Sequence, residues 1–408
     1  MKKCAFSHPP ANHRKGIDSI PVKSPWFKAG VLYFGVCVLY MNIYYVPPLT
    51  VTLMRDIGIT HFQVGVLSTS FMIAFSISNI IIGLVSVRIN QKKIMVWGLL
   101  FGFFCSLLFA FSPPSPLVIL LLLRAGLGVS TACMIAPCLL YLLSILPEKS
   151  ALAISIHLAS ITLGLGLAFL ITPPLAEIIN WRHIVILFAS LIGVASLLTL
   201  GMIGTPPSRK MNTGHGMNPS YSGLAVLFGI LFVIFIQIGA NNIWLTPWLE
   251  ENFLFSPAEI GFASMMFQMM GIPTSILGGY LYGKTRNLLY LGSLGMLLST
   301  INAAYSILEG SRSFGMVLLF ILLSRSGAFL CVGPLMSMVP KFVHADSKGM
   351  TLGMAHTICA IGIIVSSFAG GMIIEETGEY HLLWTLTAIC LVCGACILNP
   401  VFTRKWHS

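Results

Sequence analysis

Charged side chains are scarce in this chain. Asp, Glu, Lys and Arg together make up 9% of its 408 residues, whereas an average soluble globular protein carries about 25%. Hydrophobic residues make up 56%, and they gather in runs of about 20 residues, each long enough to cross about 30 Å of hydrocarbon. The composition therefore excludes an ordinary soluble protein and indicates one that crosses a membrane many times.

Carboxylates are missing from the middle of the apolar runs. Proteins that move organic cations through a membrane usually need a buried acid, both to pair with the cation and to carry a coupling proton. The absence of carboxylates within the runs therefore disfavours a transporter of organic cations. The twelve acids all fall in tails, in loops or at the ends of runs: Asp18, Asp56, Glu148, Glu177, Glu250, Glu251, Glu259, Glu309, Asp346, Glu375, Glu376 and Glu379.

Signals for processing, disulfides and metals are also lacking. Residues 1–10 contain no apolar segment, so we expect no cleavable signal peptide. Cys390, Cys393 and Cys396 recur in the last apolar run without a nearby His or acid, and we interpret them as packing residues. We therefore expect no metal, no cofactor and no disulfide framework.

The apolar runs number twelve, and one long polar stretch divides them into six and six. The first run covers residues 26–46 and stops at Pro47-Pro48, where proline is expected to end a helix. We predict an all-α polytopic membrane protein whose twelve transmembrane helices form two pseudo-symmetric six-helix bundles. Its predicted parts are an N-terminal tail (1–25), a first bundle (26–203), a linker (204–221), a second bundle (222–402) and a C-terminal tail (403–408).

Basic residues indicate the orientation. If the twelve runs cross in alternation, eighteen of the 23 Lys and Arg residues lie on the side of the N-terminus. Arg55, Arg182 and Arg312 lie on the opposite side, and Arg124 and Arg325 lie inside runs. This bias predicts cytoplasmic termini in a plasma or bacterial inner membrane. It also explains the net charge of +11 without a nucleic-acid partner, because the basic residues are spread over short loops.

The two halves repeat one another. Asn42 and Pro47 correspond to Asn242 and Pro247 at an offset of 200 residues. Similar offsets relate Gly83 to Gly279, Arg124 to Arg325 and His157 to His356. Parallel halves of six spans are the architecture of one class of secondary transporter.

Short motifs carry a family resemblance. The loop after the second run is similar to the signature Gly-x-x-x-Asp-Arg-x-Gly-x-Arg-Arg of the major facilitator superfamily, with Val87 and Asn90 replacing its Asp and second Gly. The segment 124–128 resembles the Arg-x-x-x-Gly of the family's fourth span, and residues 180–182 resemble its Trp-Arg before the sixth span. The positions that match the loop motif and its second copy are Gly83, Arg88, Lys92, Lys93, Gly279 and Lys284.

Together with the spans, the linker and the repeat, these motifs make residues 26–402 similar to that superfamily. The resemblance implies a transporter that works by alternating access, in which two bundles rock around a site near the middle of the membrane. It implies a conformational role for the loop motif, and it does not indicate a subfamily.

Arg124 and Arg325 are the strongest candidates for a binding site. A guanidinium inside the membrane costs several kcal/mol unless it faces a partner or a wet cavity, and the sequence offers neither arginine an acid at that depth. One hypothesis is that they bind an anion through charge-assisted hydrogen bonds. The alternative is a structural arginine held by backbone carbonyls or hydroxyls of a neighbouring helix.

His157 and His356 are the only groups within the runs expected to change charge near neutral pH. They are candidates for proton coupling, or for anion binding when protonated; the alternative is a neutral histidine that forms a helix contact.

Uncharged amides and aromatic rings could orient a small polar ligand, although Trp244 could equally belong to an aromatic belt at the membrane surface. The further candidate substrate-binding residues are Tyr40, Asn42, Gln237, Asn241, Asn242, Trp244 and Gln268.

The sequence thus predicts a monomeric transporter of a small anionic metabolite, with proton symport through the histidines as one mode. The alternative is a facilitator of a neutral or zwitterionic solute, with both arginines structural. We do not expect an enzyme, because the runs contain no cluster of nucleophile, base or metal ligands. A receptor without transport activity also remains open, and a measurable flux would distinguish the two.

Overall fold

The computed structural model describes residues 24–86, 89–113, 117–204, 221–285, 288–339, 342 and 348–403, and all regular structure within them is helical. Twelve helical segments of this part of the chain are long and apolar enough to cross a membrane. The predicted fold class is therefore confirmed. Of the predicted linker, residues 205–220 lie outside the described residues, so its boundaries stay predictions.

The N-terminal half contains seven α-helices and two short 3-10 helices. Their bounds are α1 (Pro25–Ile43), η1 (Pro47–Leu49), α2 (Thr50–Ile57), α3 (His61–Val85), α4 (Gln91–Phe111), α5 (Leu117–Ile145), η2 (Pro147–Lys149), α6 (Ser150–Ile178) and α7 (Trp181–Met202).

The C-terminal half repeats this arrangement with a break in its third span. Its elements are α8 (Tyr221–Asn252), α9 (Pro257–Thr285), α10 (Leu288–Ser299), η3 (Thr300–Ala304), α11 (Tyr305–Leu308), α12 (Phe314–Met338), α13 (Lys348–Thr377) and α14 (His381–Thr403). Residues 290–308, which include most of α10 and all of η3 and α11, together form one span.

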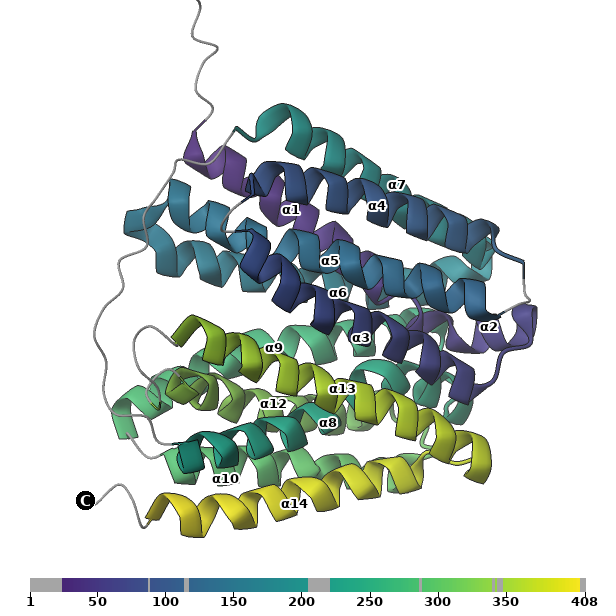
Figure 1. The fold of residues 1–408 in the computed structure, drawn as a ribbon. Coiled ribbons are helices and arrows are strands. Elements are labelled where there is room, and N and C mark those ends of the chain that lie inside the picture. Colours follow the sequence, from purple (N-terminus) through teal and green to yellow (C-terminus); the bar gives the residue numbers. More distant parts are fainter. Residues whose placement is uncertain are drawn as a thin grey trace, which may run out of the picture.

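The helices form two bundles that lie side by side (Figure 1). Within the first bundle, α5 packs on α3 and α4, and within the second, α12 packs on α9 and α10. The main contacts between the bundles are those of α3 with α13 and of α6 with α9, and η1 and α2 also contact α8.

Proline pairs have different effects in two spans. Because proline is expected to end a helix, Pro173-Pro174 predict the end of the fifth span, but α6 continues through both residues to Ile178. Neighbouring helices and local adjustments can compensate for a missing N–H inside a membrane helix. Near Pro47 the helix does break: α1 ends at Ile43, a 3-10 turn follows at Pro47–Leu49, and α2 runs from Thr50 to Ile57.

The two bundles touch closely at the end of the molecule that carries α2, which we call the α2 end. A Cβ atom on Gly65 of α3 would overlap the backbone carbonyl of Ser367 in α13. A Cβ on Gly371 would lie 2.8 Å from the carbonyl oxygen of His61. Toward the opposite end of α3 and α9, Gly83 and Gly279 have no such neighbour within 4 Å. Glycine at residues 65 and 371 therefore permits a close approach that any larger residue would prevent.

Candidate functional site

Arg325 lies at a junction of three helices in the C-terminal half. Its side chain is 4% exposed. One terminal nitrogen donates to Oδ1 of Asn242 in α8 at 3.4 Å, and the other donates to Oε1 of Gln268 in α9 at 2.7 Å. The Gln268 amide also donates to Oδ1 of Asn242, at 3.1 Å. These three side chains therefore form one closed cluster.

Two phenyl rings hold the guanidinium of Arg325 in place. Its central carbon lies 4.6 Å from the ring centre of Phe267 and 4.1 Å from that of Phe329. Such cation–π contacts are strongest where water is excluded. The sequence analysis missed both rings, although Phe329 lies one helical turn after Arg325 and could have been found from that spacing.

The packing of α12 against α10 turns Arg325 toward α8 and α9. A Cβ on Gly327 would lie 2.6 Å from the carbonyl oxygen of Gly295, so glycine allows these two helices to meet. Ser324 then faces Ser299 of α10, and each hydroxyl donates to the other residue's carbonyl, at 3.2 and 3.0 Å. Arg325, one residue further along the helix, points away from that contact.

No carboxylate neutralises Arg325 within the part of the chain that the structure describes. The ion pairs found there are Arg55–Asp56, His61–Glu251 and His381–Glu379. The acceptors around Arg325 are neutral amide oxygens, so none of them compensates its buried positive charge. An anionic ligand would thus offer this cation a better partner than it has.

Arg124 has different partners. Its two terminal nitrogens donate to the backbone carbonyls of Asn42 and Ile43, at 3.4 and 2.9 Å. These are the last two residues of α1, where carbonyls have no partner within the helix and where a cation is favoured by the helix dipole. The guanidinium also lies 5.5 Å from the ring centre of Tyr45 and 5.4 Å from that of Phe71. In this structure Arg124 caps the end of α1.

The two repeated asparagines also differ in role. The Asn42 side chain donates to the backbone carbonyls of Val38 and Phe188, at 3.1 and 2.7 Å, whereas the Asn242 side chain accepts from Arg325. The helix at Asn242 continues to Asn252, so it offers no helix end for an arginine to cap.

Three other predicted ligand-binding residues, all in α8, have hydrogen-bond partners outside this cluster. Gln237 donates to the hydroxyl of Ser324 at 3.0 Å, and Asn241 donates to the carbonyl of Gln237 at 3.0 Å. The Trp244 indole donates to the carbonyl of Ser366 at 3.3 Å, which places it in the packing of α8 on α13.

Two tyrosines at the end of α1 stack on one another. The ring centres of Tyr40 and Tyr44 are 6.4 Å apart, with 13° between the ring planes. Tyr44 interacts electrostatically with both Arg325 and Arg124, and its hydroxyl interacts with the Asn242 side chain. The N-terminal half therefore reaches the cluster through Tyr44.

The two predicted histidines have different environments. His157 is buried, with Nδ1 at 3.7 Å from Sγ of Cys138. His356 is exposed. It lies on the stripe of α13 that also holds Ala360 and Ser367, four and eleven residues further on, and Ser367 meets α3. Neither histidine forms an ion pair among the described residues.

The predicted loop motif is described in part, because Arg88 lies outside the described residues. The side chain of Asn90 caps α4 by accepting from the backbone N–H of Lys92 at 3.0 Å. Lys93 and Lys284 are exposed. Over the residues searched for metal ligands, which are the described ones, no group of three or more His, Cys, Asp or Glu side chains could hold a metal ion.

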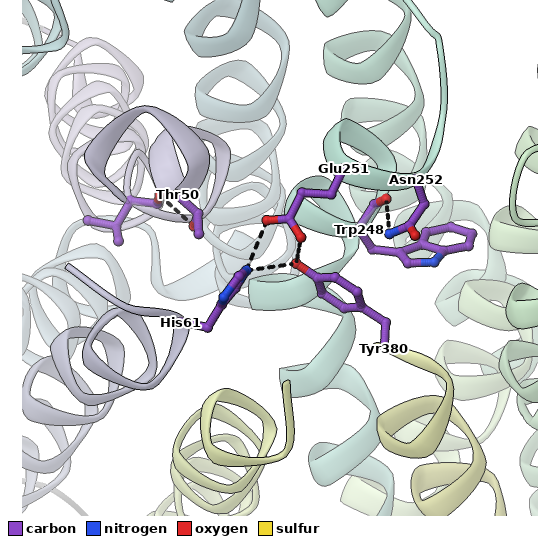
Figure 2. A network of polar contacts seen from close by, with 7 residues as sticks. Thr50, His61, Trp248, Glu251, Asn252 and Tyr380 are labelled. Carbon is purple, nitrogen blue, oxygen red and sulfur yellow. Dashed lines mark hydrogen bonds and ion pairs between the residues drawn. The ribbon is translucent and has the colours of Figure 1, made fainter. Parts of the chain in front are cut away.

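A polar network crosses the bundles at the α2 end (Figure 2). Nε2 of His61 in α3 lies 2.9 Å from Oε1 of Glu251 in α8, and the Tyr380 hydroxyl donates to the other oxygen of Glu251 at 3.0 Å. Burial, and then the Glu251 carboxylate, raise the pKa of Tyr380 well above its usual value. Tyr380 therefore stays protonated and keeps its hydrogen bond to Glu251.

Comparisons with known proteins agree with the fold. The sequence profile of the Major Facilitator Superfamily matches residues 32–220 and 227–405. An uncharacterized MFS-type transporter of Bacillus subtilis (strain 168), YceJ, is 23% identical over 387 residues, which cover 91% of this chain and 95% of the relative. The probable sulfoacetate transporter SauU of Cupriavidus necator is 23% identical over 412 residues, covering 91% and 93%.

Among solved structures, a bacterial homologue of the human lysosomal transporter Spinster, in an inward-facing and unoccupied conformation, has a TM-score of 0.78. It is 16% identical, and the match covers 93% of this chain and 97% of that one. At this identity the likeness concerns the fold alone.

Proposed function

Because the chain belongs to the major facilitator superfamily and is a membrane transporter of a small solute, we propose that its solute is a small organic anion bound by Arg325. The observation that supports this proposal is the environment of Arg325. The residue is 4% exposed, and its guanidinium donates hydrogen bonds to neutral amide oxygens. A buried cation without an anion is costly in a membrane. A carboxylate or sulfonate would compensate it and accept charge-assisted hydrogen bonds.

A relative supports this class of solute. SauU is named as a probable transporter of sulfoacetate, which is an organic anion. Asn242 and Gln268 are the proposed neighbours of the bound anion, because both touch Arg325 through amide side chains. Rotation of these side chains could free donors for a ligand without unfolding a helix. Arg124 has a structural part in this proposal, because its partners are backbone carbonyls.

Transport would follow alternating access. The bundles touch through Gly65 and Gly371 at the α2 end, and the distribution of basic residues predicts that this end lies outside the cell. The described state would then be closed on the outside, with both termini cytoplasmic and the protein monomeric in the cell membrane. Symport is proposed through His356 and His157, and His356 is the better placed because it is exposed.

A second candidate solute is neutral or zwitterionic. The observation in its favour is that the terminal nitrogens of both arginines already have hydrogen-bond acceptors. In that case Arg325 would organise the amides of Asn242 and Gln268, and these amides would bind the solute.

The test is the melting temperature of the purified protein with a panel of acetate, sulfoacetate, alanine, xylose and choline. A ligand that binds only the folded state stabilises it by about 2.7 kcal/mol at 100 times its dissociation constant. We expect a shift with the anions and none with choline. Arg325→Gln should remove the shift, while Arg55→Gln, at a side chain that is 72% exposed, should keep it. A full anion-induced shift in Arg325→Gln would refute the proposal, and a shift with alanine or xylose alone would favour the second candidate.

A further inference from the structure

Two buried amide oxygens next to the Arg325 cluster have no hydrogen-bond partner among the described residues. They are Oε1 of Gln237 and Oδ1 of Asn241, and each side chain is 1% exposed. Nε of Arg325 has no partner either. Buried polar atoms in proteins are nearly always paired, so these three atoms indicate where a ligand would complete the hydrogen bonding.

The hydrogen bonds of Ser324 indicate the amide orientation of Gln237. The hydroxyl of Ser324 donates its proton to the carbonyl of Ser299 in this structure, and in that arrangement it accepts from Gln237. The NH₂ group of Gln237 therefore faces Ser324, at 3.0 Å. Its unpartnered atom is the carbonyl oxygen, which only accepts.

The same argument applies to Asn241. Its side chain lies 3.0 Å from the backbone carbonyl of Gln237. A backbone carbonyl cannot donate, so the NH₂ group of Asn241 must face it. Asn241 is therefore also left with an unpartnered acceptor, one helical turn after Gln237 on α8.

Both residues are linked to the Arg325 cluster through neighbouring residues. Gln237 is bonded to Ser324, the residue before Arg325, and Asn241 precedes Asn242, which accepts from Arg325. This part of α8 and α12 thus contains a cation and two unpartnered acceptors. An anion without hydrogen-bond donors would pair with the cation but would leave both acceptors without a partner.

We propose that the transported anion is a hydroxy acid, whose carboxylate pairs with Arg325 and whose hydroxyl groups donate to Gln237 and Asn241. This inference rests on the proposed function and narrows its substrate class. A hydroxyl suits these acceptors better than an ammonium group does. A buried ammonium needs a compensating negative charge, and the described carboxylates within helices lie at helix ends, as Glu177, Glu250, Glu251, Glu259, Glu375 and Glu376 do.

A site built to hydrogen-bond a substrate rejects an analogue that lacks the donor, because the analogue leaves buried acceptors unpaired. We expect about a tenfold weaker affinity for each hydroxyl removed. Matched pairs of small acids measure this directly: lactate against propionate, and glycerate against lactate. Alanine serves as the ammonium counterpart of lactate. Affinities are measured by ligand-induced shifts of the melting temperature of the full-length protein.

Two variants assign the acceptors. Gln237→Met and Asn241→Leu keep the side-chain volume and remove the carbonyl oxygen, so each should bring the affinities for lactate and propionate closer together. Asn302→Leu is the matched control, since Asn302 is another buried amide with an unpartnered oxygen but is bonded to Thr387 of α14. It should keep the preference of the wild type.

The outcomes separate this inference from the proposed function. If no anion shifts the wild-type protein, the anion proposal itself fails. If lactate and propionate bind the wild type equally, the hydroxy-acid inference fails while anion transport stands. Tighter binding of alanine than of lactate would also overturn it. The comparison of lactate with propionate in the wild-type protein tests the inference even if a variant does not fold.

Discussion

His61 at the start of α3 and Glu251 in the last turn of α8 lie 2.9 Å apart, so a hydrogen bond between these side chains joins the two bundles at the α2 end (Figure 2). Both side chains are partly shielded from water, and Tyr380 adds a hydrogen bond to the same carboxylate. The rings of Phe62 and Phe368 pack beside it, with centres 5.2 Å apart. Opening of this end in a transport cycle must break the His61–Glu251 contact, the hydrogen bond of Tyr380 and the contact of Phe62 with Phe368.

Replacement of His61 should loosen the α2 end. In His61→Ala the Glu251 carboxylate loses its partner in the other bundle, so we expect faster hydrogen–deuterium exchange in residues 61–72 and 363–380. His381→Ala is the control, because His381 pairs with Glu379 of its own bundle and its loss should leave exchange in α3 unchanged. Equal exchange in wild type and His61→Ala would mean that the His61–Glu251 hydrogen bond does not hold the bundles together.

Tyr380→Phe should reveal the raised pKa of Tyr380. The variant loses the hydrogen bond to Glu251, which should cost about 1–3 kcal/mol at pH 8. Because the folded-state pKa is raised, the stabilisation by Tyr380 is full below the unfolded pKa of about 10 and is lost at higher pH. The melting temperatures of wild type and variant should therefore converge above pH 10. A constant difference up to pH 11 would contradict this assignment.

Arg124→Gln should destabilise the protein without removing ligand binding. The carbonyls of Asn42 and Ile43 lose their charged donor, and buried acceptors without partners cost about 1–3 kcal/mol each. The melting temperature of the ligand-free variant should be lower than that of the wild type. The anion should still raise the melting temperature of the variant. An unchanged melting temperature with loss of the anion shift would exchange the proposed roles of Arg124 and Arg325.

The comparison of these two arginines marks how far the sequence could predict the site. Hydrophobic run length was enough for the twelve spans, because about 20 apolar residues must cross the bilayer as a helix. The internal repeat made Arg124 and Arg325 equivalent candidates. Their partners differ because α1 ends at Ile43, whereas α8 continues through Pro247 to Asn252.

The repeat places a proline at the corresponding position of both helices, Pro47 and Pro247, but only the first is followed by a second proline, Pro48, and only that helix breaks. The contact of Phe267 with Arg325 and the amide orientation of Gln237 depend on tertiary packing, whereas the contact of Phe329 could be expected from its spacing of one helical turn after Arg325. What the sequence could name was Arg325, Asn242 and Gln268, and the structure brings these three together.

Replacement of both predicted proton-coupling residues should separate exchange from accumulation. If His356 and His157 carry coupling protons, the double variant to Gln should still exchange substrate across proteoliposome membranes. It should no longer accumulate substrate when an inward proton gradient is imposed. The single variants should show which histidine matters, and we expect His356→Gln to have the larger effect because His356 is exposed and His157 is buried. Accumulation that persists in the double variant would exclude this coupling route.

Gly65→Ala should hinder closure of the α2 end. The new methyl group would overlap the backbone carbonyl of Ser367, and a backbone atom cannot move aside as a flexible side chain can. The bundles would have to separate there, so we expect faster exchange in residues 363–380 and slower substrate transport. Gly30→Ala in α1 is the matched control. Gly30 has nothing within 4 Å of its Cβ position, and alanine there should stabilise the helix by up to about 1 kcal/mol. If Gly65→Ala transports at the wild-type rate with unchanged exchange, close contact of α3 and α13 at this end is not needed for the transport cycle.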